Sequence, residues 1–160
     1  MEINEASLIE KEMTIRNMRL TKEVLETRRS AIRWLALTIG IINPGESRLG
    51  VISVLDALVY FQFAKKRDPS AKEIEAYINS NYGEINEKTL RYHLLRMKKM
   101  GLIKNEQGRF YFSPPQKGEK FEPEDWIRSV FDSSVSQIVV NVSEVIKELN
   151  KKSLIGELTP

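Results

Sequence analysis

One stretch of the sequence, residues 68–113, constrains the fold of this chain more than any other. It predicts a helix, a turn, a second helix and a short hairpin in direct succession. The first helix is indicated by Ser70 and Glu73, which are spaced as in a capping box, where each residue bonds the backbone N–H of the other. The second helix follows Asn86, a preferred capping residue. Few folds order their parts in this way.

The second of these helices, over residues 87–100, has one apolar side and one cationic side. Leu90, Leu94 and Met97 recur at three- and four-residue spacing, which predicts the face that packs on the core. Six cations fall within seventeen residues of this region: Lys88, Arg91, Arg96, Lys98, Lys99 and Lys104. The only acid on the helix is Glu87, in the first turn, whereas an ordinary surface helix interleaves acids with cations. We therefore expect a cationic side that is unpaired within the helix and faces an anionic partner.

A hairpin is expected immediately after this helix, over residues 102–112. Gly101 ends the helix, and Gly108 supplies a turn residue between two short stretches that suit strands. The return stretch, 109–112, is rich in aromatic residues, which are enriched in strands. Positive charge also gathers in this part of the chain, because residues 41–113 hold twelve basic and eight acidic residues. A local excess of this kind is typical of a surface that binds nucleic acid.

The composition limits the chemistry that the chain can perform. It has no cysteine, so disulfides and thiolate metal sites are excluded. It has one histidine, His93, on which a histidine metal site or a catalytic triad would have to depend. We expect His93 to have a packing role instead. Because phosphate loops, nucleophile elbows and suggestive carboxylate pairs are also missing from the sequence, we expect no enzyme activity, no cofactor and no metal.

Two further helices are expected before the helix-turn-helix. Residues 4–39 contain no glycine or proline and consist largely of strong helix formers, which predicts one long helix that ends at Gly40. This N-terminal helix, within residues 1–40, is either an arm for dimerisation or packed on its own domain. Residues 48–66 predict a core helix. Asp56 within it is expected to lie on an exposed edge or to pair with an arginine.

The last part of the sequence predicts a linker, 114–122, and a second long helix, 123–160, that begins with proline and acids. Apolar residues recur in it at the spacing of a coiled-coil seam. They are Phe131, Val135, Ile138, Val142, Val145 and Leu149. Their β-branched content leaves a strand as the alternative. We expect this seam to dimerise with a second copy or to pair with the N-terminal arm; the alternative is that it folds back on its own domain.

The sequence KTLRYHLLRMKKMGLI, residues 88–103, resembles the recognition helix and following strand of winged helix-turn-helix proteins. It is most similar to the arsenical-repressor-like and multiple-antibiotic-repressor-like branches, in which an apolar residue, a His-Leu pair and a Gly-Leu-Ile end recur. The corresponding residues here are Leu90, His93, Leu94, Gly101, Leu102 and Ile103. A later leucine of the pattern is replaced by Met97. The resemblance covers about residues 50–112.

The resemblance implies a fold that is mostly α with a small β-hairpin wing: a winged helix-turn-helix domain, here 41–113, flanked by long N- and C-terminal helices. Helix 87–100 would enter the major groove of DNA, and the wing 102–112 would contact the backbone. The residues implied to read bases are Lys88, Thr89, Arg91 and Tyr92. Those implied to contact phosphates are Arg96, Lys99, Lys104 and Arg109. Leu95 departs from the family pattern, where this position is usually polar, and we expect it to pack on the N-terminal arm.

These patterns together predict a sequence-specific DNA-binding transcriptional regulator that acts as a homodimer, with double-stranded DNA and a second copy as its partners. The alternative is a winged-helix module for protein–protein contact in a chromosome-segregation or replication assembly, with at most non-specific DNA binding. No apolar run approaches the ~20 residues that a membrane-spanning helix needs. The first residues also lack the pattern of a signal peptide. We therefore expect a cytoplasmic, nucleoid-associated protein.

Overall fold

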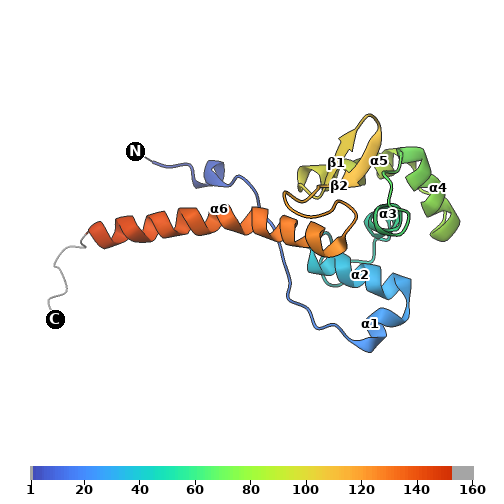
Figure 1. Cartoon of the computed structure of the whole chain (residues 1–160), viewed down its shortest axis with the longest axis horizontal. Coiled ribbons are helices and arrows are strands. Elements are labelled where there is room, and N and C mark those ends of the chain that lie inside the picture. Colours follow the sequence, from blue (N-terminus) through green and yellow to red (C-terminus); the bar gives the residue numbers. More distant parts are fainter. Residues whose placement is uncertain (1, 153–160) are drawn as a thin grey trace. The chain divides into compact units, whose positions relative to one another are not determined.

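The computed structural model describes residues 2–152, and the chain divides into two compact units between Ser113 and Pro114. The helices of the first unit are α1 (Lys22–Glu26), α2 (Arg28–Thr38), α3 (Gly50–Val59), α4 (Ala71–Asn81) and α5 (Glu87–Lys99) (Figure 1). Its strands are β1 (Ile103–Glu106) and β2 (Arg109–Phe112), and it also holds a 3-10 turn, η1 (Glu5–Leu8), and a π-helical turn, η2 (Tyr60–Ala64). The second unit contains α6 (Pro123–Lys151). The order α3, α4, α5, β1, β2 is that of a winged-helix domain with flanking helices, which confirms the expected fold class.

The apolar helix α3 forms the core of the first unit. Eight of its ten residues are buried, and it packs against α2, α4, α5 and β2. Figure 1 views α3 almost end-on, with these elements around it. A helix that is apolar on all sides has to be enclosed in this way, because any exposed side would leave apolar surface in water.

Asp56 is the charged exception within α3, since it is only 2% exposed. Its Oδ1 accepts hydrogen bonds from Arg28 Nε at 2.6 Å and from the Tyr77 hydroxyl at 3.1 Å, and its Oδ2 accepts one from the Tyr82 hydroxyl. Burial and the bond with Asp56 raise the pKa of Tyr82, so this hydroxyl stays protonated as a donor. Of the two alternatives for Asp56, pairing with an arginine is correct. The carboxylate joins α2, α3 and the end of α4.

The wing is attached to the rest of the unit by two backbone N–H groups of β2. β1 and β2 pair antiparallel, and β2 also meets the turn before α4, where the N–H of Phe110 donates to the carbonyl of Pro69 at 2.9 Å. The side-chain Oε1 of Gln62, in η2, accepts a hydrogen bond from the N–H of Phe112 at 3.2 Å. The hairpin is therefore held in place from two sides.

The single helix expected over residues 4–39 does not form. The α-helix is confined to α1 and α2, η1 forms a single 3-10 turn, and residues 9–20 run without regular secondary structure. Thr21 and Thr27 separate these elements, because each has an extended backbone and its side chain accepts an N–H from the helix that follows. A threonine that bonds to backbone groups in this way competes with helix formation.

Arg16 holds the segment before α1 in place. Its backbone N–H donates to the carbonyl of Thr38 at 3.0 Å, and its Nη1 donates to the carbonyls of Leu37 at 2.6 Å and Ile42 at 3.0 Å. Hydrogen bonds from a charged group are each worth roughly 1.5–3 kcal/mol. This exceeds the helix propensity of single residues, at most about 0.7 kcal/mol for ordinary ones. The N-terminal part of the chain is therefore not a long helical arm, and α2 packs on α3 of its own unit.

The second unit is built around α6, a helix of 29 residues. The expected helix, rather than the alternative strand, therefore forms over the β-branched residues. Its buried residues are Trp126 and Val130, whereas the predicted coiled-coil seam from Val135 onward is exposed. The last part of the helix expected to reach residue 160, from 153 on, lies outside the described residues. Within the described part of the chain, none of the helices is long and apolar enough to span a membrane.

Replacing Asp56 with alanine is expected to lower the free energy of unfolding by about 2–4 kcal/mol, because a guanidinium and two tyrosine hydroxyls lose their shared acceptor. Urea titration followed by circular dichroism measures this change. Glu84→Ala, which removes an exposed acid of the same unit, is the control and should change the value by less than about 0.5 kcal/mol. If the two variants were equally stable, the Asp56 cluster would not hold the helices together.

Candidate nucleic-acid interface

Helix α5 is anchored by one side and presents the other to solvent. Its buried residues are Leu90, Leu94 and Met97. The exposed residues at three- and four-residue spacing on the opposite side are Lys88, Arg91, Tyr92, Leu95 and Lys99, which we call the α5 stripe. The stripe therefore combines three cations with two large, partly apolar side chains.

The first turn of α5 is held in a fixed position. Asn86 caps it, since its side chain accepts the N–H of Lys88 at 2.7 Å, as the sequence predicts. In the turn between α4 and α5, the N–H of Ile85 donates to the side chain of Asn79 at 3.1 Å. The same turn begins at Tyr82, which is bonded to Asp56 in the core. These bonds fix the orientation of α5, and with it the exposed α5 stripe, relative to α3.

The four residues predicted to read bases lie together on the open first half of α5. Lys88, Thr89, Arg91 and Tyr92 are all exposed. The expectation that no cation pairs within the helix is wrong for Arg91, which forms an ion pair with Glu87 at 2.7 Å. Both side chains are largely exposed, 74% and 68%, so this pair is worth only about 0.3–0.5 kcal/mol. Arg91 can therefore exchange Glu87 for another anion at little cost.

The four residues predicted to contact phosphates fall into two kinds. Lys99 and Lys104 are exposed. Arg96 instead donates from Nη2 to the carbonyl of Ile41 at 2.9 Å, and Arg109 donates from Nη1 to Glu73 Oε1 at 2.8 Å. Both arginines hold elements of the unit in place, a role that the sequence did not indicate.

Glu73 fixes the base of the wing. It completes the predicted capping box with Ser70 and forms ion pairs with Arg67 and Arg109. Slight burial tends to raise the pKa of Glu73, but the hydrogen bonds from Arg67 and Ser70 and the two positive charges outweigh it and lower the pKa below its usual value. The carboxylate therefore stays ionised and ties α4 to β2.

The second half of α5 lies beside the N-terminal segment. A shallow hollow there is lined by Glu10, Lys11, Glu12, Tyr92, Leu95, Arg96, Lys99 and Met100. Leu95 lines this hollow with residues of the N-terminal segment and remains half exposed, and the helical arm on which it was expected to pack does not form. Lys11 lies against Gly101, at the end of α5, and adds a cation that sequence reasoning missed. No spacing rule could have placed it, because 90 residues separate the two positions.

His93 packs between α5 and the start of α3. A Cβ at Gly50 would lie 2.9 Å from its Nε2, so the glycine makes this close approach possible. Burial lowers the pKa of His93, and the positive charges of Arg96 and Arg48 lower it further. Among residues 2–152, no group of three or more potential metal ligands comes together. The neutral imidazole fits the packing role expected for it.

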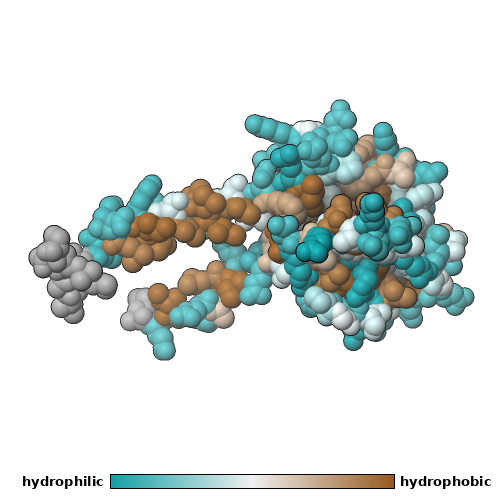
Figure 2. All heavy atoms as spheres, turned by 90° about the horizontal axis from the view of Figure 1, so that it is seen from below, coloured by the Kyte–Doolittle hydropathy of each residue, from teal (hydrophilic) through white to brown (hydrophobic). Residues whose placement is uncertain are grey.

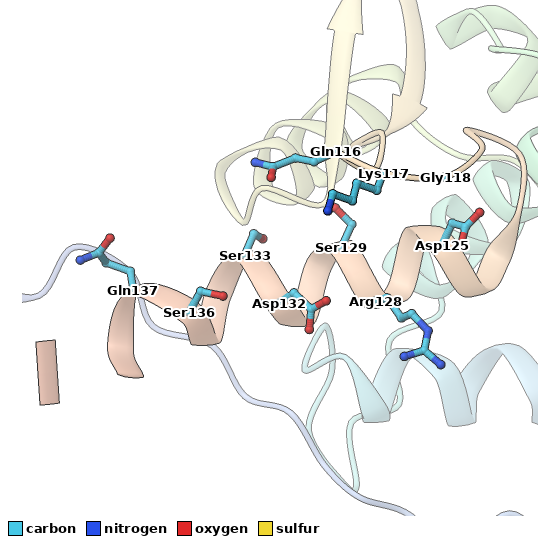
Figure 3. Close-up of a pocket in the computed structure, with 10 residues that line it drawn as sticks. All are labelled: Gln116, Lys117, Gly118, Asp125, Arg128, Ser129, Asp132, Ser133, Ser136 and Gln137. Atoms are coloured by element: carbon cyan, nitrogen blue, oxygen red, sulfur yellow. The ribbon is translucent and has the colours of Figure 1, made fainter. Parts of the chain in front are cut away.

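A separate hollow lies within the second unit, between residues 116–118 and the first half of α6 (Figure 3). It is lined by Gln116, Lys117, Gly118, Asp125, Arg128, Ser129, Asp132, Ser133, Ser136 and Gln137. Local contacts occupy two of its charged groups: Asp125 accepts the N–H of Glu119 at 2.9 Å, and Arg128 pairs with Glu124 at 2.8 Å. The lining includes neither histidine nor cysteine, the usual partners of an activated nucleophile.

The pKa of His93 predicts how stability depends on pH. Because the folded protein binds this proton less readily than the unfolded chain, the unfolded state is favoured as the pH falls below the unfolded value of about 6.5. We expect the free energy of unfolding to decrease between pH 7.5 and 5.5. In a His93→Gln variant, which has no other histidine, this decrease should be smaller. Urea titrations of both proteins at several pH values test this, and equal slopes would contradict it.

Comparison with known families identifies the domain that holds the α5 stripe. A family model of the ribonuclease R winged-helix domain matches residues 61–119, which include α4, α5 and both strands of the wing. Comparison with curated proteins and with solved structures gave no significant match. The matched family is neither of the two repressor branches that the sequence resembles most, so that finer assignment stays a prediction. The chain contains a winged-helix domain.

Proposed function

We propose that the winged-helix unit binds double-stranded DNA, with the first half of α5 in the major groove and the wing against the backbone. The observation that carries this proposal is the α5 stripe, whose cations Lys88, Arg91 and Lys99 face away from the core along one side of a well-anchored helix. The major groove of DNA, about 12 Å wide, admits an α-helix. In helix-turn-helix proteins the first residues of the recognition helix contact the bases. Lys88, Thr89 and Arg91 in that half lie away from the N-terminal segment, whereas Tyr92 lines the hollow beside it.

The exposed side chains suggest separate roles in this complex. Arg91 is the candidate for a bidentate contact with guanine, and Lys88, Thr89 and Tyr92 are its neighbours at the base edges. Lys99 and Lys104 are the candidates for phosphate contacts. Arg96 and Arg109 were predicted to contact phosphates as well. Their bonds to Ile41 and Glu73 support a role in positioning α5 and the wing against the DNA.

Regulation of transcription is the function that a winged-helix domain followed by a long apolar-faced helix supports best. The exposed seam of α6 would join at least two copies, and two reading helices would then bind half-sites about one helical turn apart. Activity on chromosomal DNA would place the protein at the nucleoid. We propose binding rather than catalysis as its biochemical activity.

Two other binding partners are alternatives to double-stranded DNA. The first is duplex RNA, because the matched family is named after a ribonuclease. The major groove of duplex RNA is deep and narrow and does not admit a helix, so the protein should bind RNA more weakly than DNA. The second is a protein, as in a chromosome-segregation or replication assembly. The half-exposed Leu95 and exposed Tyr92 within the α5 stripe favour this alternative, because aromatic and apolar side chains are common at protein interfaces.

Alanine variants separate specific from general contacts. After selection of bound sequences from a random DNA pool, Arg91→Ala should weaken binding to the selected sequence by about 1–3 kcal/mol and relax the preference at one position. Lys99→Ala should weaken binding to all DNA alike and reduce the slope of log affinity against log salt by about 1. Lys147→Ala, which removes an exposed cation of α6, is the matched control and should change neither. Fluorescence anisotropy titrations at several salt concentrations measure all three.

The outcomes distinguish the candidate ligands. Equal affinity of the Arg91→Ala variant and the unmodified protein for every DNA would show that α5 is not the reading helix. Micromolar binding without any sequence preference would favour the protein-contact alternative. Tighter binding to duplex RNA than to DNA of the same sequence would replace DNA as the ligand.

A further inference from the structure

Helix α6 carries an apolar face that its own unit does not cover. Seven of its side chains on this face are large, apolar and between about half and two-thirds exposed: Val135, Ile138, Val139, Val142, Val145, Ile146 and Leu149. Figure 2 shows brown side chains gathered along this helix. The buried residues near the start of α6, Trp126 and Val130, lie on a different side of it. The exposed face therefore needs a partner of its own.

The face is wider than the seam that the sequence predicts. At about 100° per residue, the seam residues from Phe131 to Leu149 and two further ones, Val139 and Ile146, span roughly 120° of the helix surface. A strict seam for two helices is narrower and leaves the positions of Val139 and Ile146 for charged residues. A face of this greater width is typical of a helix in a bundle, where it meets more than one neighbour. Val140 lies on the opposite side and does not belong to it.

The residue types on the face also favour more than two helices. In heptad terms Ile138 and Val145 occupy d positions, and β-branched residues there disfavour a parallel pair of helices and favour larger bundles. The positions beside the face between residues 133 and 147 include Ser134, Asn141 and Ser143, which are small or neutral. A neighbouring helix would therefore meet neutral side chains along the middle of the face, with the acids Asp132 and Glu148 beside its two ends.

The size of the face fits an interface between copies. Complete burial of an aliphatic side chain removes on the order of 60–120 Å² of apolar surface, so these half-exposed residues offer about 400 Å² per copy. Polar residues at the edges bring this toward the roughly 800 Å² per partner of a standard interface. The largest apolar patch on a typical monomer is about 300–600 Å² and is often functional, so a patch of this size marks an interaction surface.

We propose that α6 assembles four copies of this chain into a tetramer through a four-helix bundle. The occupant of each apolar face is thus the same face of other copies. Four copies contain two pairs of winged-helix units, so each pair can serve one two-fold symmetric DNA site. The proposal rests on the self-association proposed above through α6 and does not depend on DNA binding.

Adjacent residues of α6 provide a matched test on the full chain. Val139→Glu places a charge within the face, whereas Val140→Glu makes the same substitution on the opposite side, and the two valines are similarly exposed, 55% and 60%. We expect the unmodified protein and Val140→Glu to have the mass of four chains by light scattering and sedimentation equilibrium. Val139→Glu should have at most half that mass. Far-UV circular dichroism should show that both variants remain folded.

Each other outcome overturns the tetramer in a recognisable way. A mass of two chains for the unmodified protein would support a dimer and reject the four-helix bundle. A mass of three chains would show a trimer and reject the tetramer. A monomer would reject both kinds of self-association. Equal dissociation of the two variants, or none in either, would show that the wider face that includes Val139 is not the interface. Loss of DNA binding at unchanged mass would count only against the proposed function.

Discussion

The position of α5 depends on one buried carboxylate, that of Asp56. A charge inside the core of a protein is costly unless it is paired and fully hydrogen-bonded. Arg28, Tyr77 and Tyr82 satisfy it, and each comes from a different point around α3. Because Tyr82 stands where the turn into α5 begins, the same carboxylate that joins α2 to α4 also fixes the start of α5. A hydrophobic residue at position 56 would fill the same space, but it would not fix the positions of α2, α4 and the start of α5 through hydrogen bonds.

The parts of the fold that the sequence predicts are those whose signals are local. The capping box of Ser70 and Glu73 and the cap at Asn86 each act within three residues, and both form as predicted. The spacing of Leu90, Leu94 and Met97 likewise predicts the buried side of α5 and, with it, the open side. The exposed position of the candidate base-reading residues follows directly from that periodicity.

The parts that the sequence does not predict depend on contacts between distant residues. Residues 4–20 have the composition of a helix, yet Arg16 bonds to carbonyls 21 and 26 positions away and holds the segment in another conformation. Arg96 and Arg109 were predicted to contact DNA because cations on a reading helix and wing often do. Their bonds reach 55 and 36 residues along the chain, to Ile41 and Glu73. An arginine of this kind looks the same in sequence whether it binds a ligand or its own protein.

A single winged-helix unit with this modest charge has few phosphate contacts to offer, because two of the four arginines and lysines expected to make them are engaged within the protein. Joining several units raises the local concentration of each at a second site, which strengthens binding without new contacts. The α5 stripe and the apolar face of α6 lie in different compact units, so under the proposed function the affinity for one DNA site and the number of sites bound would be able to change independently. If the copies associate as proposed, the reach of the residues between Ser113 and Pro123 would determine which half-site spacings two joined units can span.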